Sequence, residues 1–189
     1  MFENRQEAGE TLSQKLLKFK GIKGAVVLAI PRGGVVVGAE ISRFLGLPLR
    51  ALVVKKVPTL GQPELAAGAI GPEGIFSGEK DRQTGKIVKE RIEKFGRLED
   101  LRGKNVILVD DGIATGATIE TAIKYLKKKR VGKIILAVPV APKETVEKLK
   151  RRVDRLIILE APVYFGAVGE FYRDFPQVGD EEVIQLLQK

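Results

Sequence analysis

The stretch VILVDDGIATGATIE, residues 106–120, joins an apolar run to two adjacent carboxylates and a turn of small residues. A short, continuous apolar run such as 106–109 is typical of a strand that is covered on both faces. Asp110 and Asp111 follow it directly, and an amphipathic segment begins near Ile119. The stretch therefore predicts a buried strand that turns into a helix, with two like charges at the junction.

The turn itself has the features of a phosphate-binding site. Backbone N–H groups at a helix start have no partner within the helix, and the helix dipole adds partial positive charge there. Small side chains let an anion reach these amides. Neither of the two common glycine-rich nucleotide motifs occurs. The residues predicted to bind the phosphate are Ala114, Thr115, Gly116, Ala117 and Thr118.

The two carboxylates indicate what the phosphate is attached to. Asp110 and Asp111 repel a phosphate, but they can accept hydrogen bonds from a vicinal diol. A ribose 5-phosphate satisfies both requirements, with its phosphate on the turn and its 2- and 3-hydroxyls on the aspartates. Two alternatives remain: a structural charge–dipole pair, or a Mg²⁺ site unrelated to sugar.

The rest of the chain repeats the strand-then-helix pattern. This alternation predicts one α/β domain over residues 1–189: a doubly wound, mainly parallel five-stranded sheet with flanking helices. Strands are expected at 25–30, 49–54, 106–109, 134–138 and 156–159, and helices at 4–19, from Val37 to Leu45, 81–95, from Ile119 to Leu126, 143–150 and 180–188. Asp180 is expected to cap the last helix. Residues 57–79 hold three prolines and five glycines, which predicts a long flexible loop with a short hairpin at 69–76.

Composition excludes several kinds of chemistry. The chain has no cysteine and no histidine, so disulfides, thiolate or imidazole metal ligands and Ser-His-Asp triads are ruled out. The net charge of +9 suits an anionic partner, either nucleic acid or a small polyphosphate. The basic runs at 127–130 and 148–152 fall near predicted helix C-termini, which favours a solvated surface for most of this charge. With no membrane-length apolar run and no apolar leader at the start, we expect a cytoplasmic protein.

Two further clusters directly follow predicted strands. They are Arg32-Gly33-Gly34 and Lys55-Lys56. Ligands of parallel α/β sheets bind at the carboxyl ends of the strands, so these clusters should lie along the same edge as the aspartates. Arg32 would otherwise be a surface ion pair. Only one of the two lysines can point inward along a strand, and Lys55 is preferred.

Residues 106–118 closely resemble the phosphoribosyl pyrophosphate (PRPP) motif of type I phosphoribosyltransferases, in which two acidic residues precede a turn ending in Thr-Gly-x-Thr. PRGG at 31–34 is similar to the family's pyrophosphate loop, and residues 57–79 to its flexible catalytic loop. Residues 160–189 correspond to its small, variable C-terminal hood. The resemblance is nearest to members whose acceptor is unassigned. It implies the type I phosphoribosyltransferase fold.

The resemblance also implies a reaction: displacement of pyrophosphate from C1 of PRPP through an oxocarbenium-like transition state. Mg²⁺ would be the cofactor, held mostly by substrate and water and only indirectly by Asp110 and Asp111. Arg32 and Lys55 would be the catalytic cations. The pyrophosphate would lie on Arg32, Gly33, Gly34, Lys55 and Lys56, near a strained or cis peptide. A homodimer without membrane contact is expected.

The acceptor is the least defined part of the prediction. Ala114 stands where some family members acting on 6-oxopurines carry an aspartate, which argues against a hypoxanthine- or guanine-like base. Adenine-like, pyrimidine-like and non-nucleobase acceptors remain open. Aromatic residues gather within 164–175, and Phe171 and Tyr172 are candidates for stacking on a planar acceptor. A satellite core or a dimer contact would explain the same clustering.

Two other functions fit the same motif. One is a regulator of this fold that binds nucleic acid and senses PRPP, which the net positive charge favours. The other is a different Mg²⁺-dependent phosphosugar enzyme with a similar turn. An enzyme that transfers phosphoribosyl to a nucleobase in nucleotide metabolism is the preferred interpretation.

Overall fold

The central sheet has the predicted size and direction. The computed structural model describes residues 1–59, 62–72, 74–78 and 82–188. Its main sheet has five strands in the order β2-β1-β6-β7-β8, and every neighbouring pair is parallel. The strands are β1 (Ala25–Ala29), β2 (Leu49–Ala51), β6 (Asn105–Val109), β7 (Ile134–Val140) and β8 (Arg155–Glu160). The predicted α/β fold is confirmed, although β2 is shorter than the expected 49–54.

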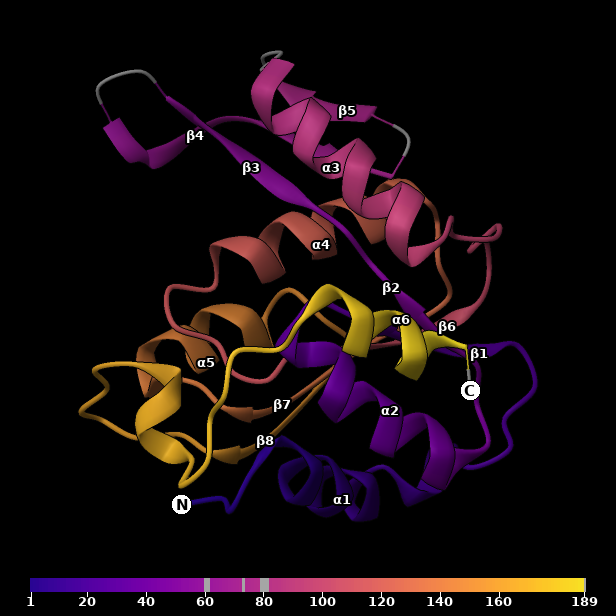
Figure 1. The fold of residues 1–189 in the computed structure, drawn as a ribbon, viewed down its shortest axis with the longest axis vertical. Helices are drawn as coiled ribbons and strands as arrows, with labels where there is room; N and C mark the ends of the chain where they lie inside the picture. Colours follow the sequence, from indigo (N-terminus) through magenta and orange to yellow (C-terminus); the bar gives the residue numbers. More distant parts are fainter. Residues whose placement is uncertain (60–61, 73, 79–81, 189) are drawn as a thin grey trace.

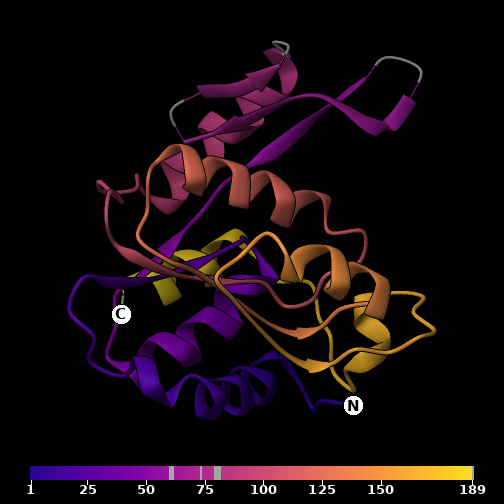
Figure 2. The same ribbon diagram turned by 180° about the vertical axis from the view of Figure 1, so that it is seen from behind.

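Helices cover both faces of this sheet (Figures 1 and 2). Helices α1 (Arg5–Lys15), α2 (Gly33–Leu45) and α6 (Asp180–Leu187) pack on one face, and α4 (Ala117–Lys128) and α5 (Lys143–Lys150) on the other. Alternate strand residues face opposite layers: Ile107 belongs to the first core and Leu108 to the second. None of the helices in the described ranges is long and apolar enough to cross a lipid bilayer.

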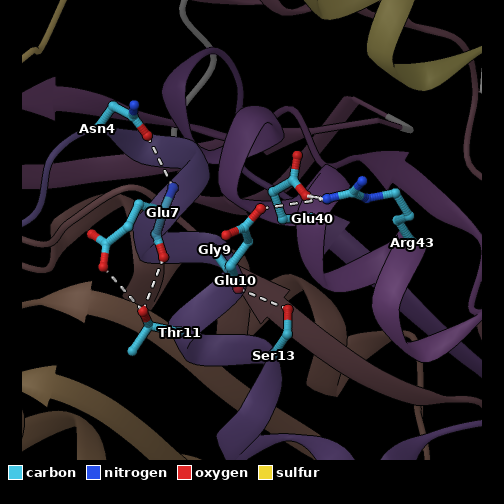
Figure 3. Close-up of polar contacts among 8 residues, drawn as sticks. All are labelled: Asn4, Glu7, Gly9, Glu10, Thr11, Ser13, Glu40 and Arg43. Carbon is cyan, nitrogen blue, oxygen red and sulfur yellow. Dashed lines mark hydrogen bonds and ion pairs between the residues drawn. The ribbon is translucent and has the colours of Figure 1, made fainter.

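Helix α1 begins where the sequence predicts and is locked by local hydrogen bonds (Figure 3). The Asn4 side chain accepts a hydrogen bond of 2.9 Å from the Glu7 N–H, as an N-cap should. Within the helix, Ser13 Oγ donates to the Gly9 carbonyl at 2.7 Å. The helix ends at Lys15, and residues 17–19 of the predicted segment form a 3₁₀ turn instead.

The packing of α1 on α2 depends on a glycine. A Cβ on Gly9 would lie 2.9 Å from both Glu40 Cβ and the Val37 carbonyl oxygen, so only glycine lets the helices approach this closely. Arg43 of α2 pairs with Glu40 and reaches Glu10 of α1 at 3.6 Å (Figure 3). This close contact holds the first turn of α1, and with it Arg5, at a set distance from the sheet.

The prediction of a long loop at 57–79 is wrong in extent, because much of this segment forms a second sheet, but the short hairpin predicted at 69–76 is confirmed, since Ile70 pairs with Ile75 in an antiparallel ladder. Strands β3 (Lys55–Thr59), β4 (Gln62–Gly71) and β5 (Gly74–Gly78) form an antiparallel ribbon that extends away from the main sheet beside α3 (Arg82–Phe95). Pro58 is accommodated at a shift in the β3–β4 register. The expected first residue of α3, Asp81, lies outside the described residues.

The last helix is capped differently from the prediction. Gly179 occupies the N-cap position of α6, and Asp180 is the first helical residue. The Asp180 carboxylate lies 2.7 Å from Lys94 Nζ and 3.7 Å from Arg32 Nη1. Asp180 therefore faces cations of neighbouring elements rather than the amides of its own helix.

The buried strand residues should dominate stability. Leu136 of β7 is fully buried, so Leu136→Ala should lower the free energy of unfolding by about 2–5 kcal/mol, measured by urea denaturation. Leu17→Ala is the control, because Leu17 is 53% exposed; it should change the value by less than about 0.5 kcal/mol. Equal effects of the two substitutions would contradict this placement of the core.

Candidate functional site

A pocket of about 290 Å³ lies at the carboxyl ends of β1, β2 and β6. It unites the three clusters that the sequence places after strands, as expected for a parallel sheet. Its polar lining residues are Arg32, Lys55, Arg91, Asp110, Asp111 and Thr118. Lys55 is therefore at the pocket, while the side chain of Lys56 lies outside the part of the structure that is described.

The loop between β1 and α2 passes directly over the two aspartates. Its Pro31–Arg32 peptide bond is cis, as the family resemblance implies. A Cβ on Gly33 would overlap the Asp111 carboxylate, lying 2.6 Å from Asp111 Cγ. A Cβ on Gly34 would lie 2.8 Å from Asp110 Cα. Both glycines are thus required by the packing of the protein itself, a reason that the sequence did not reveal.

The two aspartates have different environments. Asp111 Oδ2 lies 2.7 Å from Arg5 Nε, and this pair is largely buried. Asp110 forms no ion pair with any described residue, and its Oδ1 accepts a 2.9 Å hydrogen bond from the Asp111 N–H. Burial and the neighbouring Asp111 charge raise the pKa of Asp110 above its usual range. Arg5 thus neutralises one carboxylate of the pair and leaves the other without a cationic partner.

Arg5 was not among the predicted site residues. A signal was present, because Arg5 precedes Ala8 and Leu12 on the buried face of α1, where an arginine is rarely found without a partner. Nothing in the local sequence shows what that partner is, since Asp111 lies more than 100 residues away in the chain.

The predicted phosphate-binding turn is open. The backbone N–H groups of Thr115, Gly116, Ala117 and Thr118 donate to no acceptor among the described residues. Gly116 has φ of +81°, in the left-handed region that favours glycine. The Ala114 carbonyl accepts a 3.0 Å hydrogen bond from Thr145 Oγ1 of α5, which ties the turn to the neighbouring helix. These unpartnered amides are what an anion-binding helix start requires.

The candidate acceptor residues lie in a small core instead. Tyr172 is 5% exposed, and its ring packs against Phe2 and Phe175 at centroid distances of 5.4 and 4.8 Å. Phe171 stacks on Phe165 at 5.2 Å. A buried ring has no free face for a base, so stacking on Tyr172 is corrected in favour of the satellite-core alternative. Its hydroxyl donates a 2.5 Å hydrogen bond to the Asp111 carbonyl, and burial raises its pKa.

The cations at the pocket come from separate elements. Arg32 precedes α2, Lys55 opens β3, and Arg91, which the sequence analysis missed, belongs to α3. Arg32 also faces Asp180 at 3.7 Å, so it takes part in an ion pair as well as lining the pocket. The hydrogen bond from Lys94, with a smaller contribution from Arg32, lowers the pKa of the Asp180 carboxyl.

The acidic groups fit only a metal ion that is held largely by its substrate. Within the described ranges, no group of three or more acidic side chains is arranged to hold a metal. Asp110 and Asp111 are the carboxylates of the pocket, and Asp111 already pairs with Arg5. Mg²⁺ commonly keeps several waters and binds through one or two carboxylates plus phosphate oxygens, which this donor set allows.

The fit of Gly33 over the ion pair can be tested. Gly33→Ala should lower the free energy of unfolding by at least about 1 kcal/mol in thermal or urea denaturation, because its Cβ would overlap a carboxylate that cannot move freely. Gly85→Ala in α3 is the matched change: its Cβ would meet only Ile70 Cδ1 at 3.9 Å. It should be neutral or stabilise by up to about 1 kcal/mol. A larger loss of stability for Gly85→Ala than for Gly33→Ala would exclude the close packing of Gly33 on Asp111.

Comparisons with known proteins agree with this geometry. The family model described as "Phosphoribosyl transferase domain" matches residues 2–172. Rv0571c of Mycobacterium tuberculosis, provisionally named a phosphoribosyl transferase, is 38% identical over the whole chain. The chain spans about half the length of this relative, 47%. The uracil phosphoribosyltransferase of Aquifex aeolicus is 26% identical, over 62% of this chain and 60% of that protein.

A solved structure is similar over almost the whole chain. The crystal structure of TT1426 from Thermus thermophilus is 36% identical, with a TM-score of 0.88, and the match covers 98% of this chain and 97% of that one. The match includes both the main sheet and the C-terminal segment, given its coverage. Together with the open phosphate turn, the paired aspartates and the family match over most of the sequence, this shows that the chain belongs to the phosphoribosyltransferase family, with the type I fold.

Proposed function

We propose that this chain transfers the 5-phosphoribosyl group from PRPP to a small acceptor and releases pyrophosphate, with Mg²⁺ as cofactor. The observation that carries the proposal is the pocket itself. It places a carboxylate without a cationic partner, Thr118 at the start of α4 and three cations from different elements around one space, and the open amides of 115–117 adjoin Thr118 in the chain. Each of these groups matches one part of PRPP: a phosphate, a ribose diol and a pyrophosphate.

PRPP would lie with its 5-phosphate at the start of α4 and its pyrophosphate at the loop 31–34. Its 5-phosphate accepts hydrogen bonds from the amides of 115–118 at the start of α4, where the helix dipole also favours an anion. The ribose hydroxyls donate to Asp110, whose Oδ2 accepts no hydrogen bond from the described residues. The pyrophosphate lies towards the loop 31–34 and the side chain of Lys55.

The cations have a clear chemical role in such a reaction. As the bond at C1 breaks, negative charge grows on the departing pyrophosphate, and Arg32, Lys55 and Arg91 are already placed to stabilise it. Mg²⁺ bound to substrate oxygens, near Asp110 and Asp111, would supply further positive charge to the leaving group. No side chain of the pocket needs to act as a nucleophile, because the acceptor provides the attacking atom.

Exclusion of water would fall to the second sheet. An oxocarbenium-like centre reacts with water unless it is covered. Lys55 is the first residue of β3 and Arg91 lies on α3, so two of the pocket's cations belong to the part of the chain that adjoins the pocket and then extends away from the main sheet (Figure 1). Contact of these cations with pyrophosphate would draw that part of the chain over the reacting centre.

A nucleobase is the proposed acceptor. The relative from Aquifex aeolicus is named for uracil, and Ala114, which can neither accept nor donate a proton through its side chain, disfavours a 6-oxopurine. Because the Tyr172 ring is buried, the acceptor must be recognised by other groups. These observations favour a pyrimidine or an adenine-like base.

A turnover screen tests the reaction. Pyrophosphate release from PRPP should depend on one of the acceptors offered, which would be purines, pyrimidines and small amines in the presence of Mg²⁺. Arg32→Ala is the control for contaminating activity, and it should reduce the rate at least about tenfold, because a preorganised cation at the leaving group is lost. PRPP binding without turnover of any acceptor would favour a PRPP-sensing regulator, whose nucleic-acid affinity should then fall steeply with salt.

The ribose contact can be measured without knowing the acceptor. Asp110→Asn should weaken PRPP binding at least about tenfold in calorimetry, because hydrogen bonds to a charged group contribute about 1.5–3 kcal/mol. Asp100→Asn is the control, since Asp100 is exposed and bonds only to the Arg102 N–H. Unchanged affinity of the Asp110 variant would exclude this placement of the ribose.

A further inference from the structure

We infer that Arg5 is a positioning residue of the PRPP site: it holds Asp111 in place, and through Asp111 it orients both Asp110 and the loop 31–34. The inference rests on the proposed function, because it states which residues of that same site bind the ribose and which hold them in position. It also divides two roles that the sequence pattern treats as equal. Asp110 binds substrate, and Asp111 is part of the framework.

The Arg5 side chain is held in one orientation by three contacts. Its side chain is only 8% exposed, and its Nη1 donates a 2.8 Å hydrogen bond to the Pro176 carbonyl in addition to the Asp111 contact. The guanidinium carbon lies 3.7 Å from the centre of the Phe175 ring. A planar cation with two directional hydrogen bonds and a stacked ring has little freedom to rotate. Arg5 therefore presents its Nε to Asp111 in a defined direction.

Asp111 is fixed from two sides. Its Oδ2 accepts from Arg5 at 2.7 Å, and its main-chain carbonyl accepts from the Tyr172 hydroxyl at 2.5 Å. Arg5 comes from the first turn of α1 and Tyr172 from the segment after β8. The two ends of the chain meet at this residue, so its position depends on both rather than on β6 alone.

The loop 31–34 packs directly on the ion pair. A Cβ on Gly33 would overlap the Asp111 carboxylate and lie 2.8 Å from Arg5 Nε. Gly33 of the loop 31–34 is thus in direct contact with the Arg5–Asp111 ion pair. A displaced Asp111 side chain would remove this contact at the place where the pyrophosphate is proposed to bind.

The orientation of Asp110 depends on the same arrangement. Its Oδ1 accepts the 2.9 Å hydrogen bond from the Asp111 N–H, which turns the carboxylate and leaves Oδ2 for the ribose. Two neighbouring carboxylates repel each other, and Arg5 offsets the charge of Asp111. Removal of Arg5 would leave Asp111 buried without a cation and free to turn towards the pocket.

The N-terminal segment and the segment after β8 are also joined by an exposed ion pair, which provides a matched control. Glu3 and Arg173 lie 2.5 Å apart, and their side chains are 58% and 66% exposed. This pair connects the N-terminal segment to the segment after β8 without contact to Asp110 or Asp111. A variant without the Glu3–Arg173 pair therefore shows the effect of a weaker connection between the two segments alone, without loss of the buried Arg5–Asp111 pair.

The experiment measures PRPP affinity by calorimetry with Mg²⁺, together with urea denaturation, for Arg5→Gln, Arg5→Lys, Tyr172→Phe and Arg173→Gln. Arg5→Gln should weaken PRPP binding at least about tenfold. Arg5→Lys should restore part of that loss, because it keeps the charge but not the planar fork. Tyr172→Phe should weaken binding several-fold, and Arg173→Gln should leave it unchanged. A merely structural role would lower stability while the folded protein kept its affinity.

A double variant tests whether Arg5 acts through Asp111. Arg5→Gln combined with Asp111→Asn should bind PRPP about as well as Arg5→Gln alone, because the two changes remove one interaction. The inference would be overturned if the losses of affinity from the two substitutions multiplied in the double variant, or if folded Arg5→Gln bound PRPP with wild-type affinity.

If Arg5→Gln does not fold, Tyr172→Phe decides, since it keeps the Arg5–Asp111 ion pair and removes only one hydrogen bond to Asp111. Unchanged PRPP affinity of Tyr172→Phe would then overturn the inference. Wild-type protein that fails to bind PRPP would instead overturn the proposed function.

Discussion

The pairing of β1 with β6 is the constraint on which the site depends. The strands are parallel and in register, so that Ala29 lies opposite Val109, and the Ile30 N–H extends the ladder to the Val109 carbonyl at 2.9 Å. The segments that follow β1 and β6 therefore leave the sheet side by side. The loop 31–34 and the aspartates 110–111 must pass within van der Waals distance of each other. Two successive glycines follow from this, because any side chain at either position would enter the space of the aspartates.

The charged side chains of the site alternate in sign from the sheet to the pocket. Arg5 lies on the inner side and pairs with Asp111, so the buried negative charge next to the sheet is balanced within the protein. Asp110 faces the pocket without a cation, and Arg32, Lys55 and Arg91 surround the other side. This order suits a ligand that carries a neutral diol between two anionic groups. The same residues without Arg5 would present two adjacent, repelling carboxylates.

Periodicity and turn chemistry were enough to predict most of the fold and the main clusters of the site. The apolar runs became the five parallel strands, Asn4 caps the start of α1 at the predicted position, and α2 ends at the predicted Leu45. The prediction of a loop at residues 57–79 was wrong in extent, because Pro58, which lies at a register shift, and the nearby glycines were interpreted as signals for a loop, but the hairpin predicted at 69–76 was confirmed. The prediction was also wrong for Asp180, whose carboxylate is attracted to Lys94 and Arg32 rather than to its own helix. The error at Asp180 arises from an interaction between segments that are distant in the chain, whereas the ribbon pairs segments that follow one another directly.

The sequence by itself determined the alternation of helices with the five strands of the main sheet and the identity of the PRPP-like motif, because these depend on residues within a few positions of one another. It also placed Arg32, Lys55 and Asp110 at one edge, since the carboxyl ends of parallel strands must meet there. Only the tertiary structure decided that Asp111 pairs with Arg5, that Tyr172 is a buried anchor and that Arg91 reaches the pocket. These contacts join residues that are far apart in the chain, and no local pattern of side chains specifies which distant group will meet a buried charge.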